Sequence, residues 1–154
     1  MKDTYRKHNN RLHIIIGCGR LGAKAASVLS AAGIEVVVID VSQDAFGRLA
    51  PSFTGFTVEA DACDTHILER ADIDKAGTVL VVTGNDNANI MISQIAKTLY
   101  EVPCVVTRLY DTAKEELLEG SGIGVIFPLK LEIEAFKDLI GMSPEEHGKG
   151  FIQS

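Results

Sequence analysis

The chain alternates short, continuously apolar runs with longer segments in which apolar residues return at helical spacing. The apolar runs predict six strands, at residues 12–16, 36–39, 56–59, 78–82, 103–107 and 125–127. The helical segments predict helices at residues 20–32, 42–50, 65–71, 85–100, 111–119 and 129–140. Connections of this length require parallel strands. Right-handed crossovers then predict an α/β, doubly wound, Rossmann-like sheet with six parallel strands in the order 3-2-1-4-5-6.

These elements occupy residues 11–141, which are interpreted as a single domain without repeats or linkers. Residues 1–10 are polar and basic, and we expect a flexible, solvated segment there rather than a contact with an anionic surface. Residues 142–154 are expected to form a loose tail. The glycine cluster at 120–124 follows a helix and precedes a strand, so it predicts a helix stop and a turn.

Charge and composition narrow the class of protein. The 154 residues carry a formal net charge of −6, and such a field repels a nucleic-acid backbone. The longest apolar runs are too short to cross a bilayer, and the polar start of the chain lacks the apolar core of a signal peptide, so we expect a cytoplasmic protein. The three cysteines, Cys18, Cys63 and Cys104, are expected to be free thiols in that compartment.

A glycine-rich motif directly follows the first strand and opens the first helix. It reads Gly17, Cys18, Gly19, Arg20, Leu21 and Gly22. Gly17 permits a tight turn, Gly19 lets the backbone approach a phosphate, and Gly22 lets the helix pack closely on the sheet. The N-terminus of the helix then offers free N–H groups and a positive dipole end to an anion. The alternative is a tight turn that binds nothing.

An acidic residue, Asp40, ends the second strand beside this loop. A carboxylate there accepts hydrogen bonds from both hydroxyls of an adenosine ribose and repels a 2′-phosphate. We therefore expect an adenine nucleotide as the ligand, NAD(H) or AMP, ADP or ATP, with NADP disfavoured. Val41, which follows the acid, belongs to the same expected binding set. The alternative for Asp40 is a solvated acid at a strand end.

Further motifs, taken together with this loop, resemble the N-terminal nucleotide-binding domain that regulates potassium channels and transporters, known as the RCK or KTN domain and described by the TrkA-N family. The resemblance rests on the glycine loop, Asp40, the segment 60–64, the segment 83–86 before a long helix, and Arg108. It covers residues 11–141, nearly the whole chain. One departure is Ala60, where the family usually has the glycine of Gly-Asp-Ala.

The resemblance implies roles for residues outside the glycine loop. Asp61 and Ala62 would lie near the adenine, Thr83, Gly84 and Asn85 would lie beside the ribose and phosphates, and Arg20 and Arg108 would contact phosphate. Other interpretations stay open at two of these positions. Arg108 could be a surface arginine paired with Asp111, and Asp61 could cap the following short helix, although Asp64 is the stronger candidate for that cap.

The resemblance also implies a function. It describes a regulatory subunit of a potassium uptake system that senses a nucleotide and gates a membrane-embedded channel or transporter subunit. Such a protein would be held at the inner face of the membrane through its partner. A companion chain could supply the second regulatory domain that the family usually has.

The sequence supports an enzymatic function less well than a regulatory one. An NAD-dependent oxidoreductase needs a substrate-binding part and an acid or base beside the nicotinamide, and residues 11–141 leave no room for that part. Tyr110 and Lys114 fit a Tyr-x-x-x-Lys pattern, but Asp111 places the pair at a helix start. Cys63 and His66 are only two ligands, which do not make a zinc site. We expect no metal and no catalytic residue. A ligand-free dimerisation module is a further alternative.

The last predicted helix, 129–140, carries apolar residues around more than one face. A helix at the end of a one-domain sheet has one face to pack against its own core. The remaining apolar surface predicts a homodimer, a higher oligomer or a heterodimer with a related chain. The alternative is that the helix wraps the edge of the sheet.

Overall fold

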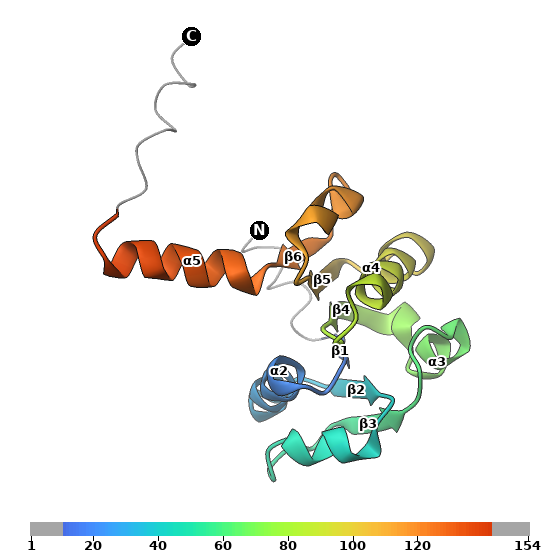
Figure 1. Ribbon diagram of the computed structural model, residues 1–154. Coiled ribbons are helices and arrows are strands. Elements are labelled where there is room, and N and C mark those ends of the chain that lie inside the picture. Colours follow the sequence, from blue (N-terminus) through green and yellow to red (C-terminus); the bar gives the residue numbers. More distant parts are fainter. Residues whose placement is uncertain (1–10, 143–154) are drawn as a thin grey trace.

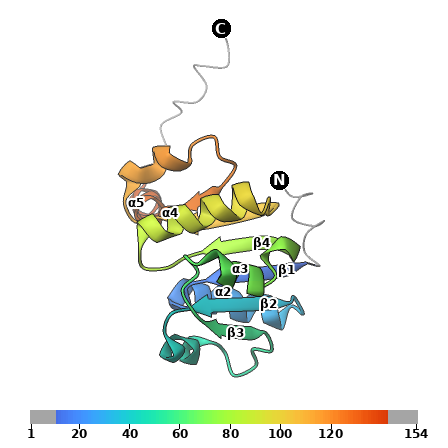
Figure 2. The ribbon, with the colours of Figure 1, turned by 90° about the vertical axis from the view of Figure 1, so that its right-hand side faces the viewer.

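The computed structural model describes residues 11–142, which form the expected six-stranded parallel sheet (Figures 1 and 2). Its strand order is β3-β2-β1-β4-β5-β6, as predicted. The strands are β1 (Leu12–Ile16), β2 (Val36–Asp40), β3 (Phe56–Glu59), β4 (Ala76–Val81), β5 (Cys104–Arg108) and β6 (Gly124–Ile126). The order reverses between β1 and β4, where a doubly wound sheet opens a crevice at the carboxyl ends of its strands. The predicted basic segment 1–10 and the tail beyond residue 142 lie outside the described residues.

Helices cover both faces of the sheet (Figure 1). Helix α2 (Arg20–Ala31) lies on one side, and α3 (Thr65–Arg70) and α4 (Asp86–Gln94) lie on the other. The central strands β1, β2 and β4 therefore contribute to two apolar cores. In β1, Ile14 and Ile16 belong to the core beneath α3 and α4, and Ile15 belongs to the core beneath α2. All three are almost fully buried, because successive side chains of a strand point to opposite faces.

Two predicted helices are 3₁₀ segments instead. Residues 42–50 form η1 (Gln43–Arg48), and the side chain of Ser42 makes no capping hydrogen bond, so the predicted cap is wrong. The N–H of Ser42 donates to Asp40 instead. Residues 111–119 form η4 (Thr112–Leu118), where the Asp111 carboxylate caps the segment through the N–H of Ala113 as predicted.

The long predicted helix over residues 85–100 is present but changes form near its end. Asn85 caps α4 by accepting a hydrogen bond from the N–H of Ala88 (2.9 Å), and the chain continues as the π-helical segment η3 (Ile95–Leu99). A further short 3₁₀ segment, η2 (Ile73–Lys75), precedes β4. The glycine cluster between η4 and β6 is a stop and turn, as predicted, with positive φ angles at Gly120 and Gly122.

The last helix, α5 (Pro128–Leu139), extends away from the sheet (Figure 1). None of its residues is buried. Its large apolar side chains are all more than two-fifths exposed, and they are Leu129, Leu131, Ile133, Phe136 and Leu139. The expectation that one face of this helix packs on its own core is therefore wrong, and so is the alternative that it wraps the sheet edge. No helix among residues 11–142 is both long and apolar enough to cross a membrane.

Candidate functional site

The three glycines of the glycine loop differ in what the fold demands of them. Gly17 has φ +100°, and a Cβ there would lie 2.7 Å from the carbonyl oxygen of Val82. A Cβ on Gly22 would lie 1.8 Å from the carbonyl oxygen of Gly17. Gly19 has an ordinary φ of −77°, and a Cβ there would meet nothing within 4 Å. Backbone strain and packing therefore explain two glycines, and the third faces open space.

The N-terminus of α2 points its positive end into this open space. Gly19 occupies the N-cap position without a side chain to cap the helix, and the first turn contains no acidic residue. The Asp40 carboxylate lies beside the loop and accepts hydrogen bonds from the N–H of Cys18 (2.7 Å) and the N–H of Ser42 (2.8 Å). Each carboxylate oxygen keeps acceptor capacity beyond the one bond it makes. The site thus combines free helix N–H groups with an ordered acid.

Two hollows meet at Asp40 and Gly84. The first, the apolar hollow, has a volume of about 360 Å³. Its lining includes Ile16, Gly17, Ile39, Asp40, Val41, Asp61, Ala62, Thr83, Gly84, Asn85 and Ile92. The second, the arginine hollow, has a volume of about 650 Å³. Its lining includes Cys18, Gly19, Arg20, Leu21, Asp40, Arg48, Gly84, Arg108 and Tyr110. Both volumes fall in the range of small-molecule sites.

Almost all of the predicted site residues therefore line one of these two hollows. The exception is Gly22, which lies beneath the loop, where its missing side chain allows α2 to approach Gly17. The site also contains residues that were not predicted to bind the nucleotide. Tyr110, considered above only as part of a Tyr-x-x-x-Lys pattern, lines the arginine hollow, and so does Arg48, which comes from η1 and lies outside every motif.

A buried amide holds the Thr83 loop in place. Asn89 is fully buried on α4. Its carbonyl oxygen accepts hydrogen bonds from the N–H and the hydroxyl of Thr83, and its amide donates to the carbonyl oxygens of Thr83 (3.1 Å) and Arg108 (2.9 Å). This one side chain ties the end of β4 to the end of β5. Its sequence signal is weak, namely a polar residue on the buried face of an amphipathic helix.

The guanidinium of Arg108 lies at the mouth of the arginine hollow, half-buried. One of its terminal nitrogens donates to the carbonyl oxygen of Val82 (3.1 Å), and the group lies 4.8 Å from the centre of the Tyr110 ring. Its Nε is buried and has no hydrogen-bond partner among the described residues. Among residues 11–142 it makes no ion pair with Asp111, which caps η4, so the alternative of a surface pair is wrong.

The segment after β3 resolves the choice between two acids. The Asp64 carboxylate caps α3 by accepting a hydrogen bond from the N–H of His66 (2.9 Å), as expected of the stronger candidate. Asp61 instead accepts a hydrogen bond from the N–H of Cys63 (2.9 Å), which closes the turn at the rim of the apolar hollow. Asp61 therefore does not cap the helix, and its carboxylate remains at the hollow.

The cysteines at the site are free, as predicted, and unactivated. Burial raises the pKa of the Cys18 thiol, and the Asp40 carboxylate raises it further, while the positive charge of Arg48 opposes both effects. Burial and a hydrogen bond with Asp61 raise the pKa of Cys63 in the same direction. Thiols with raised pKa stay protonated near neutral pH and are poor nucleophiles. Within residues 11–142, no group of three or more side chains is arranged to hold a metal ion.

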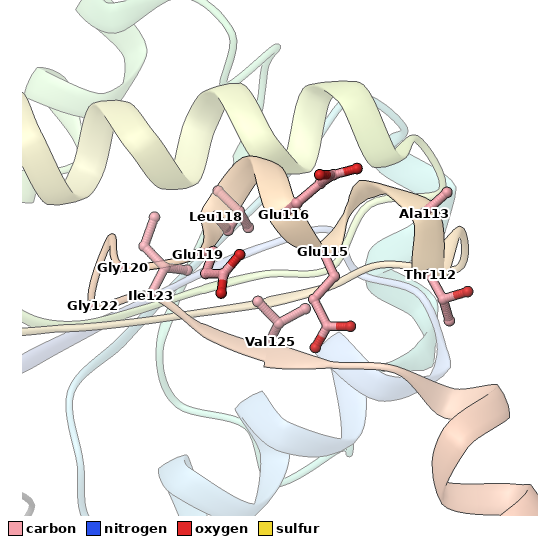
Figure 3. Close-up of a pocket in the computed structure, with 10 residues that line it drawn as sticks. All are labelled: Thr112, Ala113, Glu115, Glu116, Leu118, Glu119, Gly120, Gly122, Ile123 and Val125. Carbon is pink, nitrogen blue, oxygen red and sulfur yellow. The ribbon is translucent and has the colours of Figure 1, made fainter.

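A separate hollow of about 630 Å³ lies between η4 and β6 (Figure 3). Its rim carries three glutamates, Glu115, Glu116 and Glu119, and its lining includes Leu118 and Ile123. None of the predicted site residues lines it. Its acidic rim is opposite in character to the arginine hollow, so it is not a site for a phosphate.

Comparison with known protein families identifies the family of this chain. The model of the TrkA-N domain matches residues 13–128, which is most of the chain. The chain belongs to the TrkA-N domain family. The resemblance expected from the glycine loop, Asp40 and the later motifs is thereby confirmed.

Individual relatives of this TrkA-N domain are potassium transport proteins. It is 36% identical over 116 residues to the Trk system potassium uptake protein TrkA of Streptomyces coelicolor, covering 75% of this chain and 52% of that protein. The chain spans about half the length of the curated relatives it matches.

Solved structures share its fold. The GsuK channel bound to NAD is 25% identical, with a TM-score of 0.71, over 86% of this chain and 23% of that one. The structure of GsuK bound to ADP is 24% identical, with a TM-score of 0.70, over 89% of this chain and 36% of that one.

Proposed function

We propose that this TrkA-N domain binds an adenine nucleotide in the two joined hollows and uses it to regulate potassium uptake. The proposal rests above all on the surroundings of Gly19. Neither its backbone angle nor its packing requires a glycine, and the space in front of it opens on an uncapped helix N-terminus. A glycine that lets a phosphate approach the backbone accounts for this position.

In this proposal each hollow holds a different part of the nucleotide. The adenine would lie in the apolar hollow near Ala62, and the ribose hydroxyls would bond to Asp40, where the hollows meet. The phosphates would lie at Gly19 and the N-terminus of α2, with Arg20 and Arg108 on either side. Arg108 lines the arginine hollow, so its guanidinium would bring positive charge close to such an anion. The negative charge of Asp40 opposes a 2′-phosphate, so NAD(H) or AMP, ADP or ATP would bind better than NADP(H).

Thermal melts with each nucleotide test this proposal. A ligand present at about 100 times its dissociation constant stabilises the fold by roughly 2.7 kcal/mol. We expect that gain with NAD or ADP and a smaller one with NADP. We expect Gly19→Val to weaken binding at least tenfold, because its methyl groups enter the space that the phosphate needs.

Gly47→Val is the matched control. Gly47 also has open space before its missing Cβ, but it lies on η1 and lines neither hollow. It should keep the wild-type affinity. Equal affinities of the Gly19 and Gly47 variants would contradict the proposed phosphate position, and a larger gain with NADP than with NAD would contradict the role of Asp40.

The regulatory part of the proposal concerns a membrane-embedded partner. The relatives named TrkA are potassium uptake proteins, and GsuK is a channel. We propose that this domain acts in the cytoplasm on such a channel or transporter, at the inner face of the membrane, as a homodimer or higher oligomer. A companion chain would supply the second regulatory domain. Gating then requires the nucleotide to bind two arrangements of the assembly with different affinities.

The surface for assembly would be α5. Its apolar side chains are exposed around more than one face, and a monomer in water gains nothing from that exposure. A second copy of the chain would bury them. Dimers formed through α5 would bring two nucleotide sites into one assembly.

An NAD-dependent oxidoreductase is the alternative from another class. The thiols at the hollows do not favour it, because their raised pKa values make them poor nucleophiles. Hydride transfer from NADH to a carbonyl compound would support the enzyme instead. If no nucleotide binds to the purified protein, the remaining interpretation is a ligand-free dimerisation module.

A further inference from the structure

A third hollow adjoins the arginine hollow and lies between α2 and the η1 region. It has a volume of about 560 Å³ and is lined by Arg20, Ala23, Lys24, Ser27, Arg48 and Ala50. Arg20 and Arg48 line both hollows, so the two hollows adjoin each other at these side chains. We call it the α2 hollow.

Three cations and no carboxylate line the α2 hollow. Among residues 11–142, Arg20, Lys24 and Arg48 make no ion pair, as is also true of Arg70, Lys97 and Lys114, whereas Lys75, Lys130 and Lys137 each pair with a carboxylate. In a chain with a net charge of −6, acidic partners are abundant. The α2 hollow nevertheless brings three cations together with no carboxylate in its lining.

The local structure works against these charges. Arg20 and Lys24 are four residues apart on α2, where like charges repel each other. Arg20 is also the first residue of the helix, where the dipole favours negative charge and disfavours cations. A local arrangement that opposes helix stability in this way is expected where function requires it. An anion between the cations would reverse both penalties.

The third cation is held in place by contacts between η1 and α2. The N–H of Ala50 donates to the hydroxyl of Ser27 (3.0 Å), which joins the end of η1 to α2. The guanidinium of Arg48 lies 3.5 Å from the carbonyl oxygen of Cys18 in the glycine loop. Arg48 is thus fixed beside the loop although it lies 30 residues along the chain.

We infer that Arg48 and Lys24, with Arg20 between them, form a second phosphate subsite for the terminal phosphates of a nucleoside triphosphate. This inference rests on the proposed function. With the adenine in the apolar hollow and the ribose at Asp40, the first phosphate lies at Gly19. The second and third phosphates would then lie nearer Arg20 and Arg48 and enter the α2 hollow. AMP is too short to reach this subsite, and ATP reaches it.

The subsite predicts a graded preference among the adenine nucleotides, measured by calorimetry on the full chain. We expect the affinity to rise from AMP to ADP to ATP. We expect Arg48→Gln and Lys24→Gln each to weaken ATP binding about tenfold, which is about 1.4 kcal/mol, and to change AMP binding less than twofold. Arg70→Gln removes the same charge from the end of α3 and should change neither affinity.

The outcomes separate this inference from the proposed function. If no adenine nucleotide binds the wild-type chain, the proposed function fails. If AMP and ATP bind but the Arg48 and Lys24 variants lose both equally or lose neither, the nucleotide site stands and the second subsite is wrong. If Arg48→Gln selectively weakens NADP relative to NAD while ATP is unaffected, Arg48 serves a 2′-phosphate and the assignment to terminal phosphates is overturned.

Discussion

The glycine loop and helix α5 both present unused binding capacity, but of opposite kinds. At the loop, the exposed groups are N–H groups, guanidinium groups and a carboxylate, which water can solvate. On α5, the exposed groups are large apolar side chains, with Leu139 at 87% exposure and Leu131 at 61%. Water can hydrogen-bond to the polar groups at the loop. Contact between water and the apolar side chains of α5 is unfavourable.

This contrast indicates that the two regions differ in how much their structure depends on a binding partner. The glycine loop is held in place by the fold itself, through Gly17, Gly22 and Asp40, and the buried Asn89 holds the neighbouring Thr83 loop, so the site is formed before any ligand arrives. Helix α5 has no buried residue and depends on whatever covers it. We therefore expect a nucleotide to bind reversibly to a preformed site, whereas the partner of α5 is a standing part of the assembly.

The largest expected effect tests whether the fold alone holds the loop. Gly22→Ala places a Cβ 1.8 Å from the carbonyl oxygen of Gly17 and forces α2 away from the sheet. We expect a loss of about 3 kcal/mol or more in the free energy of unfolding, measured by urea denaturation without ligand. Gly19→Ala should change that free energy by no more than about 0.5 kcal/mol. Similar losses in the two variants would mean that the loop is not part of the packed fold.

The next effect tests the dependence of α5 on a partner. Phe136→Glu puts a charge into the apolar surface of α5, and we expect the dimer dissociation constant to rise about 100-fold, or about 2.8 kcal/mol. Sedimentation velocity over a range of concentrations measures this change. The circular dichroism of the domain should not change, because Phe136 is exposed in the single chain.

Asp138→Ala is the matched control, since it removes an exposed charge from the same helix. It should sediment like the wild type. A wild-type chain that is monomeric at every concentration would remove the argument for α5 as an assembly surface.

The smallest expected effect tests whether Asn89 holds the Thr83 loop in the form that binds the nucleotide. Asn89→Ala leaves the N–H of Thr83 and the carbonyl oxygen of Arg108 without their partner inside the protein. We expect a loss of about 2 kcal/mol in stability, together with weaker nucleotide binding, because the Thr83 loop is no longer tied to β5. Asn87→Ala, on the exposed side of the same helix, should alter neither. Unchanged nucleotide affinity in the Asn89 variant would show that the loop needs no such tie.

Much of the architecture could be predicted because its signals are local. The alternation of apolar runs and helical segments predicts the strand order, and the caps at Asn85, Asp64 and Asp111 each act on an N–H two or three residues away. The prediction failed at residues 42–50, where a serine before a short segment suggests a capped helix. There the N–H of Ser42 serves Asp40, and its side chain caps nothing.

The sequence by itself determined the fold class, the family and the two arms of the site that carry motifs, the glycine loop with Asp40 and the segment around Thr83. The tertiary structure alone decided what joins them. Arg48 reaches the glycine loop from η1, Asn89 ties β4 to β5, and α5 leaves the sheet with all its faces open. Periodicity and capping depend on neighbours within one or two turns of the chain, so a single sequence displays them. Contacts between side chains twenty or thirty residues apart arise only when parallel strands and their crossovers bring distant segments together, and no local pattern records that placement.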